Sequence, residues 1–283
     1  MSLRLTAGPV TEDRGSAPAG AHDTGSVGLG DITREAFLFL GAGSTVILQL
    51  AEPGVGHGVA DHSTTLDRPL DRLRTTMTYI YAVTLGTEDE RRRVVRMVNK
   101  AHVPVRSATY NAFDPELQLW VAATLYHGAV DLHERFHGPL DDASADRVYR
   151  EAAIYGTALQ VREDMWPQDR HAFRAYWTES LDNLSVDAEV RHYVRQLLRG
   201  GRAPRPIRAA TGLNRFVTIG LLPPQLREAL ALPWSDRDQR RFDRLMTVLP
   251  PVYNRMPVWL RTLPSRYYLR DMRRRLAAHR HVI

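Results

Sequence analysis

The stretch Asp67–Val105, DRPLDRLRTTMTYIYAVTLGTEDERRRVVRMVNKAHVPV, predicts two consecutive helices joined by a short turn. Asp67 is suited to cap the first helix, and Pro69 is tolerated in its opening turn because the proline lacks a donor that would go unused there. Gly86 is the expected point of chain reversal. Two helices joined by so short a turn are expected to pack antiparallel.

The second helix has its own start and stop signals. Thr87 and Glu90 are three residues apart and predict a capping box at its first turn. Pro104 removes a backbone donor and ends the helix, so His102 belongs to its last turn. At helical spacing His102 shares a face with Val95 and Val98.

Together the two helices present an arginine, a hydroxyl and an imidazole, because Arg72 and Thr76 lie one turn apart on the first of them. This is a set of groups able to bind and orient a ligand. Each also has a purely structural interpretation. Arg72 could pair with Asp71 or Asp67, Thr76 could bond the carbonyl four residues earlier, and His102 could be a buried histidine at a helix end.

The composition excludes several kinds of chemistry. The chain has 283 residues, 43% of them apolar and 25% charged, which is ordinary for a soluble globular protein. It has no cysteine, so disulfides, thiolate metal sites, iron–sulfur clusters and thiol catalysis are excluded. The net charge is +6, but Lys100 is the only lysine and acidic residues are interspersed, so we expect no nucleic-acid partner.

The pattern of apolar residues predicts an all-α protein. No segment shows period-two alternation bounded by hairpin turns, and no internal repeat is evident. Residues 1–30 are rich in Gly, Ser, Thr, Ala and Pro and predict a flexible N-terminal segment. We expect residues 31–283 to form one large multi-helix domain.

The first ordered element is expected at Ile32–Leu50, as a buried helix that is too short for a comfortable membrane span. Gly41 and Gly43 would allow a neighbour or a flat ligand to approach it closely, and Pro53 would end it. Without an apolar run behind a basic start, a secretory signal is not expected, and we assign the chain to the cytoplasm.

The segment Gly54–Thr65 is expected to be a loop. Its His57, Asp61 and His62 are metal-ligating residue types, although they lack a rigid spacing and an obvious fourth partner. Loop histidines are more often plain polar residues, and we favour that interpretation.

Farther along, Asp114 followed by Pro115 is a strong helix start. Further amphipathic helices follow. The C-terminal helices are expected to be interrupted at each of several prolines, namely Pro223-Pro224, Pro233, Pro250-Pro251, Pro257 and Pro264.

Several motifs recur in a fixed order from about residue 31 to the C-terminus: ILQL-AEPGV, RPLDRLRTT, GTEDE, VNKAH, DPELQLW and LLPPQLREALALPW. In this order the sequence resembles the MpaB and latex-clearing-protein family of helical proteins that bind haem b. That family includes oxidative enzymes that cleave polyisoprene.

The resemblance assigns roles to three residues. Arg72 and Thr76 match an Arg-x-x-x-Thr pair, which makes them candidate catalytic residues, with Arg72 also near the haem. His102 matches the helix histidine that serves as axial iron ligand, which makes it the candidate metal-binding and cofactor-binding residue.

The sequence also departs from the family. Thr75 stands where the rubber-cleaving members have lysine, Ala122 where many relatives have histidine, and Ser107 where they have glycine. The missing lysine argues against polyisoprene as the substrate, and the missing histidine removes a polar group from the pocket.

The resemblance therefore implies a haem-b-dependent oxygenase or oxidoreductase. Its expected partners are a small or lipophilic organic substrate and, for an oxygenase, dioxygen. A haem or apolar-ligand carrier without turnover is the alternative, and a helical interaction module without a pocket is a third hypothesis. The residues themselves are compatible with haem, because His102 can donate to iron and Arg72 can bind a carboxylate in a bidentate fashion.

Two further features have both a functional and a plain interpretation. Tyr149 and Glu151 are expected to begin a helix with a polar pair in a mostly apolar environment, where the carboxylate is either a base near a haem or a charge at the helix N-terminus, and we favour the latter. The segment Arg266–His281 is strongly basic. It is either a solvated helix face or a peripheral contact with anionic lipid headgroups.

Overall fold

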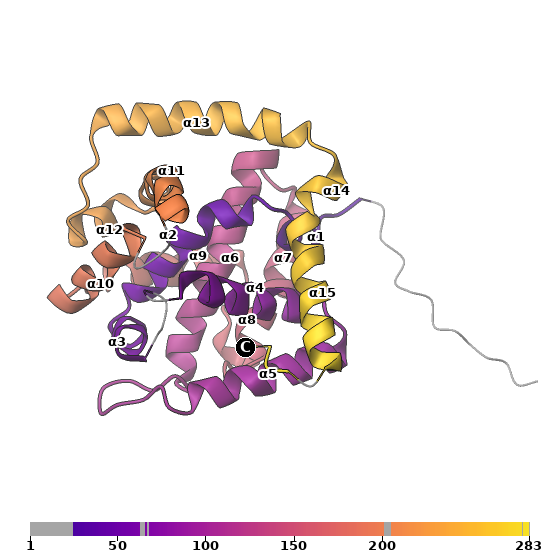
Figure 1. Ribbon diagram of the computed structural model, residues 1–283. Helices are drawn as coiled ribbons and strands as arrows, with labels where there is room; N and C mark the ends of the chain where they lie inside the picture. Colours follow the sequence, from indigo (N-terminus) through magenta and orange to yellow (C-terminus); the bar gives the residue numbers. More distant parts are fainter. Residues whose placement is uncertain (1–24, 63–65, 67, 201–204, 279, 283) are drawn as a thin grey trace, which may run out of the picture.

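The computed structural model describes residues 25–62, 66, 68–200, 205–278 and 280–282, and within these ranges every regular element is a helix. A bridge between Arg106 and Asn111 is the one β-type contact among the same residues. The predicted all-α fold is confirmed (Figure 1).

The α-helices follow one another in the order α1 Leu29–Thr33, α2 Leu38–Leu50, α3 Pro53–His62, α4 Pro69–Leu85, α5 Glu88–His102, α6 Pro115–His137, α7 Asp142–Ala152, α8 Ile154–Thr157, α9 Arg170–Asp182, α10 Ala188–Leu198, α11 Arg205–Leu221, α12 Pro224–Ala229, α13 Asp236–Asn254, α14 Val258–Arg261 and α15 Leu263–Ala277. A single 3₁₀ turn, Glu163–Met165, lies between α8 and α9.

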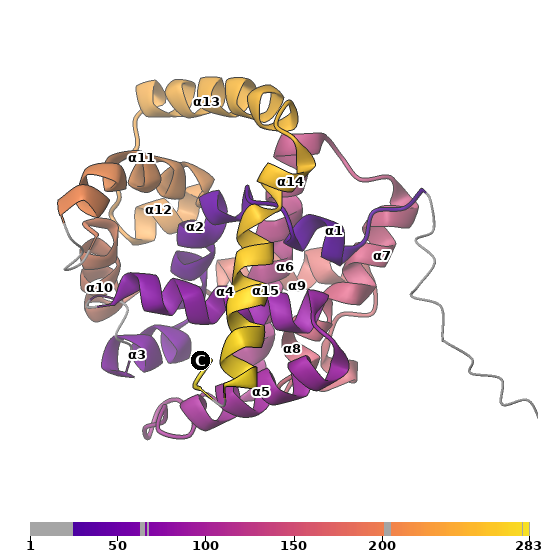
Figure 2. The same ribbon diagram turned by 45° about the vertical axis from the view of Figure 1, so that its right-hand side comes forward.

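The core forms around α2 and α6. The helix α2 packs against both α6 and α11, while α13 crosses one end of the molecule and α15 packs across α4 (Figures 1 and 2). Glycines permit this close packing. A Cβ on Gly41 would come within 2.5 Å of Leu132 of α6, and one on Gly43 would collide with the Thr218 side chain of α11. The two glycines are therefore explained by a protein neighbour.

The predicted helix Ile32–Leu50 is wrong in one respect, because the chain bends between α1 and α2. The Glu35 carboxylate accepts a hydrogen bond of 2.6 Å from the Tyr253 hydroxyl, and the Ala36 amide donates to the Arg261 carbonyl over 2.8 Å. These partners lie more than 200 residues away in sequence and replace the bonds of a continuous helix.

The predicted loop Gly54–Thr65 is also wrong, since most of it forms α3. The Glu52 carboxylate accepts from the Val55 amide over 2.8 Å and supplies a partner in the first turn. Gly56 lets α3 fold back at 107° to α2, because a Cβ there would lie 2.5 Å from the Leu50 carbonyl oxygen. The end of the predicted loop, residues 63–65, lies outside the described residues.

Ordered packing begins before residue 31, where we placed the start of the domain. The Val27 amide donates to the Ser144 hydroxyl over 2.9 Å, and the Leu29 amide donates to the Glu151 carboxylate over 2.7 Å. These contacts tie the chain to α7 ahead of the predicted boundary. Residues 1–24 of the predicted flexible segment lie outside the described residues.

The C-terminal prolines mark helix starts more often than breaks. Pro224 and Pro264 lie in the first turns of α12 and α15, where no donor is needed. The expectation that Pro250-Pro251 interrupts a helix is wrong, because both lie inside α13. Each removes one intrahelical donor, and the helix continues for only three residues beyond them.

The tight turn between α2 and α3 predicts different effects of alanine at two glycines. We expect Gly56→Ala to lower the free energy of unfolding by about 1–3 kcal/mol, because the new methyl group meets the Leu50 carbonyl oxygen and Val190. Gly212→Ala, in a helix with nothing near the added carbon, is expected to stabilise by about 0.5–1 kcal/mol. Chemical denaturation of both variants measures the difference, and equal effects would contradict it.

Candidate functional site

The helices α4 and α5 pack against each other and carry the three predicted site residues. Arg68 is the N-cap residue of α4, and Pro69 follows it; the predicted cap, Asp67, lies outside the described residues. Gly86 reverses the chain as predicted, but with an ordinary negative φ of −80°. Glycine is favoured there for space, because a Cβ would come within 2.5 Å of the Ala82 carbonyl oxygen.

The boundaries of α5 agree with the sequence prediction. The Glu90 amide donates to the Thr87 hydroxyl over 3.2 Å, and the Thr87 amide donates to the Glu90 carboxylate over 2.9 Å, which completes the capping box. The helix ends at His102, two residues before Pro104. His102 therefore lies in the last turn, as predicted.

A small apolar cluster holds α5 in place. Val94 and Val98 of α5 are buried against Met272 and Leu276 of α15, together with Val282 near the C-terminus. These contacts fix the rotation of α5 about its axis. The direction of the His102 side chain is consequently set by packing and not by the histidine alone.

His102 is a partly buried histidine held at the end of this rigid helix. Its ring lies 6.2 Å, centroid to centroid, from the Phe113 ring in an edge-to-face arrangement. The Nδ1 atom is buried without a hydrogen-bond partner among the described groups. Burial, with a smaller effect of the Arg72 charge, lowers the pKa of His102 to about 4. The imidazole is therefore neutral at neutral pH and keeps a lone pair.

Arg72 faces the same region from α4. Solvent reaches its side chain, yet the surrounding protein lowers the pKa of its guanidinium. The guanidinium is thus open to solvent on one side and partly desolvated by protein groups on the other. The surface ion pair considered for Asp71 is instead made with Arg68, over 2.8 Å.

Thr76 lies one turn after Arg72 on α4 and is partly buried. No described side chain bonds to its hydroxyl, whereas the Thr75 hydroxyl donates to the Arg72 carbonyl over 2.9 Å. Thr75, at the position of the rubber-cleaving lysine, is thus the residue that bonds back to its own helix. The Thr76 hydroxyl is available for a ligand.

Tyr193 of α10 is a neighbour of Arg72 that sequence reasoning missed. The tyrosine is buried, its hydroxyl has no partner among the described residues, and it lies close enough to Arg72 to act on the guanidinium electrostatically. In sequence it has the helical spacing of an ordinary core residue beside Val190 and Val194. Nothing local marks it as part of the site.

Comparison with known proteins identifies the family of the chain. The model of the family described as ER-bound oxygenase mpaB/B'/Rubber oxygenase, catalytic domain, matches residues 31–250. The chain belongs to this family. Uncharacterized protein Mb2261 of Mycobacterium bovis and Uncharacterized protein Rv2237 of Mycobacterium tuberculosis are each 45% identical to it over 250 residues, which is 85% of this chain and 98% of theirs. No solved structure matches.

Ala122 and Ser107 are two other departures from the MpaB and rubber-oxygenase pattern, and the structure shows where each lies. Ala122 is fully buried in α6, so an apolar methyl group in the core stands where many relatives have histidine. Ser107 is exposed and bonds Thr109 in the loop after α5. Five residues after Ala122, His127 stacks on Trp177 with ring centroids 4.1 Å apart, and burial lowers its pKa. His127 was not among the predicted site residues.

The histidines and aspartate of the predicted metal loop do not converge. His57 pairs with Asp187 over 2.5 Å, and the Tyr110 hydroxyl donates to Asp61 over 2.7 Å. His62 contacts the Tyr110 ring at 6.0 Å. Within the described ranges no group of three His, Cys, Asp or Glu side chains could hold a metal ion. These residues fasten α3 to its neighbours instead.

Tyr149 and Glu151 also have structural partners. The Tyr149 hydroxyl donates to the Pro167 carbonyl, and Glu151 pairs with Arg147 over 2.9 Å while accepting the Leu29 amide. The prediction that these residues begin a helix is wrong, because both lie in the last turns of α7. The Glu151 carboxylate binds the start of α1 instead, so it is a helix N-terminal charge for that helix and has a structural partner.

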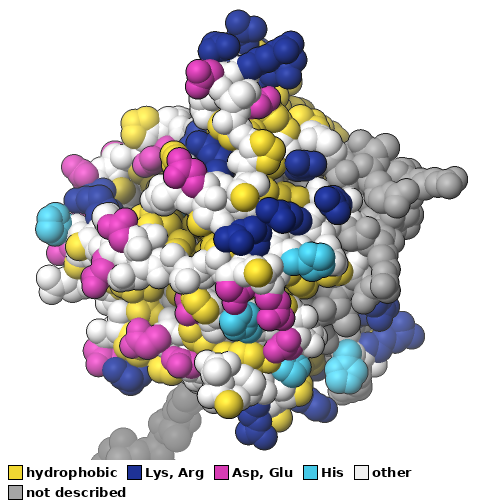
Figure 3. Space-filling model, turned by 90° about the vertical axis from the view of Figure 1, so that its left-hand side faces the viewer, with side chains coloured by type: hydrophobic (Ala, Val, Ile, Leu, Met, Phe, Trp, Pro, Cys, Tyr) yellow, Lys and Arg dark blue, Asp and Glu magenta, His cyan; other side chains and the backbone are white. Residues whose placement is uncertain are grey.

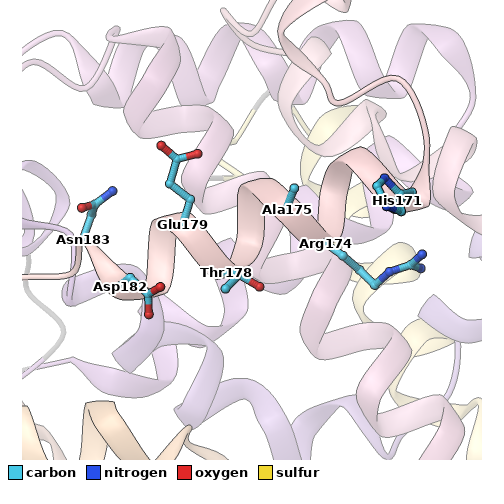
Figure 4. A pocket seen from close by; sticks show the side chains of 7 residues that line it. All are labelled: His171, Arg174, Ala175, Thr178, Glu179, Asp182 and Asn183. Carbon is cyan, nitrogen blue, oxygen red and sulfur yellow. The ribbon is translucent and has the colours of Figure 1, made fainter.

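A surface hollow of about 710 Å³ lies along α9, with side chains from that helix as its lining (Figure 4). Its polar groups project from a single helix and belong to His171, Arg174, Glu179, Asp182 and Asn183. The hollow has none of the predicted site residues. We therefore place the candidate site at Arg72 and His102, where an exposed arginine of α4, a partly buried histidine of α5 and the buried Tyr193 of α10 lie near one another.

Charges of both signs are mixed on the face of the molecule that looks away from α15. The face shown in Figure 3 has acidic, basic and histidine side chains interspersed with apolar ones. Among the described residues no single helix has the length and apolar composition to cross a membrane. The helices α2 and α3 reach that composition only when taken together, across their 107° bend.

A second pair of histidines lies in α6, apart from the predicted site. The rings of His133 and His137 are 5.1 Å apart, and both contact Phe37. Burial, followed by the charge of His137, lowers the pKa of His133 to about 4, and its Nδ1 has no described partner. We interpret His133 as a core histidine that the fold keeps neutral, with the exposed His137 beside it.

His133 predicts a loss of stability in acid. Its folded pKa of about 4 lies below the unfolded value near 6.5, so the folded chain binds fewer protons between these values. Stability is complete above pH 6.5 and falls as the pH drops toward 4, by at most about 3 kcal/mol from this group. His133→Phe should flatten this slope in thermal unfolding scans, whereas exposed His171→Gln should not. An unchanged slope in His133→Phe would contradict the assignment.

Proposed function

We propose that the chain binds haem b between α4 and α5 and acts as an oxygenase-type oxidoreductase on a small or lipophilic organic substrate. Family membership supports an oxygenase-type activity. The observation that supports haem is specific to this site: a neutral, hydrogen-bond-free imidazole lies within electrostatic range of a cation.

His102 has the properties of an axial ligand. Iron needs an unprotonated ring nitrogen, and the low pKa of His102 provides one across the physiological range. Its Nδ1 is buried, while Nε2 is neither buried nor bonded to a described group, which leaves Nε2 as the nitrogen for iron. The packed α5 helix would hold the ring in one orientation.

One feature of a typical haem histidine is missing. Ligating histidines usually donate the other ring N–H to a carbonyl or carboxylate, but Nδ1 of His102 has no such described partner. Such a partner makes the ring a stronger donor. We therefore expect His102 to bind iron as a plain imidazole, without added anionic character.

Arg72 fits the role of propionate anchor. A partly desolvated guanidinium favours an anion as its partner, and its planar fork matches a carboxylate in two parallel hydrogen bonds. A haem propionate would supply that charge and also relieve the repulsion that Arg72 exerts on a protonated His102. The buried Tyr193 hydroxyl is the nearest further donor that we identify beside Arg72.

The chemistry itself would belong to the haem, which supplies one-electron and dioxygen chemistry when it is bound. The protein residues would bind, orient and exclude water. The Thr76 hydroxyl, on the same helix face as Arg72, would donate a hydrogen bond to bound substrate or oxygen. Thr75 cannot replace a lysine as a cation, so we do not propose polyisoprene as the substrate.

The His102 assignment predicts a spectroscopic outcome. Purified protein titrated with haemin should show a Soret band and about one haem per chain, and His102→Ala should bind at least about tenfold more weakly. Added imidazole should restore part of the wild-type spectrum, since it can fill the vacated position. His127→Ala removes another buried histidine and should bind haem normally.

Three results would decide between the alternatives. An unchanged spectrum and affinity in His102→Ala would remove His102 from the site. Loss of haem in His127→Ala but not in His102→Ala would move the ligand to α6. Haem binding without oxygen consumption, across a range of lipophilic substrates, would favour a carrier over an enzyme.

The Arg72 assignment concerns geometry as well as charge. Arg72→Ala should weaken haem binding by about 2–3 kcal/mol, and Arg72→Lys should recover little of this loss because an ammonium group cannot form the bidentate contact. Circular dichroism should show an intact fold in both. Arg68→Lys, one turn earlier on the same helix, is the matched control. Full recovery in Arg72→Lys would mean that the contact is simple charge neutralisation.

A further inference from the structure

Large apolar side chains are exposed where α13 ends and α15 begins. Six of them are each between 50% and 65% exposed, and we call them the corner patch: Val248, Val252, Val258, Trp259, Leu263 and Tyr267. They follow one another through α13, α14 and α15 at one corner of the molecule (Figures 1 and 2). Exposed apolar side chains gathered in this way are typical of an interaction surface.

The charge around the corner patch has one sign. Residues 244–270 contain five arginines and no acidic residue. Of these arginines, Arg261 is turned inward and pairs with Glu35 over 3.4 Å. No described acidic side chain pairs with the other four, which are Arg244, Arg255, Arg266 and Arg270, and all four are exposed.

Helical spacing places these arginines beside the apolar residues. On α15, Leu263, Arg266, Tyr267 and Arg270 fall on one stripe, three or four residues apart. On α13, Arg244 falls on the same stripe as Val248 and Val252, with Arg255 just beyond the helix end. The apolar surface is thus flanked by cations that no described acid neutralises.

An apolar groove adjoins the patch. It encloses about 400 Å³ and is lined by Phe39, Leu263, Pro264, Tyr267 and Tyr268. The groove offers aromatic and aliphatic surface and almost no polar groups. A hydrocarbon chain segment is the kind of ligand that such a groove accommodates.

We propose that the corner patch docks on the surface of an anionic lipid bilayer. Trp259 and Tyr267 are the residue types that lie at headgroup level, and the arginines would contact lipid phosphates. The valines and the leucine would enter the acyl boundary. This proposal does not depend on haem.

The sequence suggested a membrane contact along the basic segment Arg266–His281. The contact that we propose lies at the start of that segment and in the helices before it. Arg273 pairs with Glu90 over 2.7 Å, and Arg275 pairs with Asp271 over 2.7 Å, so part of the charge of the tail is used within the protein. The beginning of α15, and not its basic end, combines free cations with exposed apolar side chains.

Vesicle co-sedimentation of the full chain tests the proposal. Binding is expected to phosphatidylcholine vesicles that contain roughly 30% phosphatidylglycerol, to be weak without the anionic lipid, and to fall with added salt. The double variant Arg266→Gln/Arg270→Gln should bind on the order of fivefold more weakly for each arginine removed. Arg96→Gln/Lys100→Gln, with the same charge change on exposed positions of α5, is the control.

A second pair of variants tests the apolar part. Trp259→Ser/Tyr267→Ser should lose binding at least about tenfold, while Leu70→Ser/Leu213→Ser, equally exposed elsewhere, should retain it. Brominated lipid should quench part of the tryptophan fluorescence, and Trp259→Phe should remove that quenched component. Unfolding curves of all variants exclude a general loss of fold.

Three outcomes would overturn the proposal. These are no binding to anionic vesicles, an equal loss in the control variants, or unquenched Trp259. A lipid-free dimer in sedimentation velocity that Trp259→Ser/Tyr267→Ser disrupts would show that a second copy of the chain covers the patch instead.

Discussion

A neutral imidazole within electrostatic range of an arginine is the constraint around which the candidate site is built. His102 and Arg72 would repel each other if both were charged, and burial alone already disfavours protonation of the histidine. The packing of α5 keeps the His102 ring near Arg72, because the helix cannot rotate away. Its capping box fixes one end, and Val94 and Val98 fix its inner face against α15. A site held in this way keeps a lone pair and an uncompensated positive charge ready for a ligand that brings both a metal and a carboxylate.

Local signals in the sequence predicted much of this arrangement. The Thr87–Glu90 box and the Pro104 stop define α5, and with them the place of His102, because each acts through backbone bonds only three or four residues away. Asp114 and Pro115 mark the start of α6 for the same reason. Family resemblance then assigned roles to residues whose types are already suited to them.

Contacts between distant parts of the chain could not be predicted from the sequence. The bend after α1 depends on Tyr253 and Arg261, and nothing near Glu35 in sequence announces these partners. The glycines of α3 led us to predict a loop, because glycine has a low helix propensity. The contacts of Gly56 with the Leu50 carbonyl and Val190 are tertiary, and the local sequence does not reveal them. Tyr193 was not predicted as a site residue for a related reason. In sequence, a buried tyrosine of an amphipathic helix has the same spacing whether its hydroxyl faces the core or a functional arginine.

The helix α15 connects the two surfaces for which we propose functions. Met272 and Leu276 in its second half pack on α5, the helix that carries His102, and its middle packs across α4, which carries Arg72. Its first half exposes Leu263 and Tyr267 and lines the apolar groove. The groove ends at Phe39 and Tyr268, whose rings stack at 6.0 Å, and Tyr268 lies 5.9 Å from the buried Tyr81 of α4. Aromatic side chains thus continue from the exposed corner into the helix that carries Arg72. A lipophilic substrate that partitions into a bilayer would meet the protein at this corner, so the position of the patch and the apolar nature of the proposed substrate have a common physical basis.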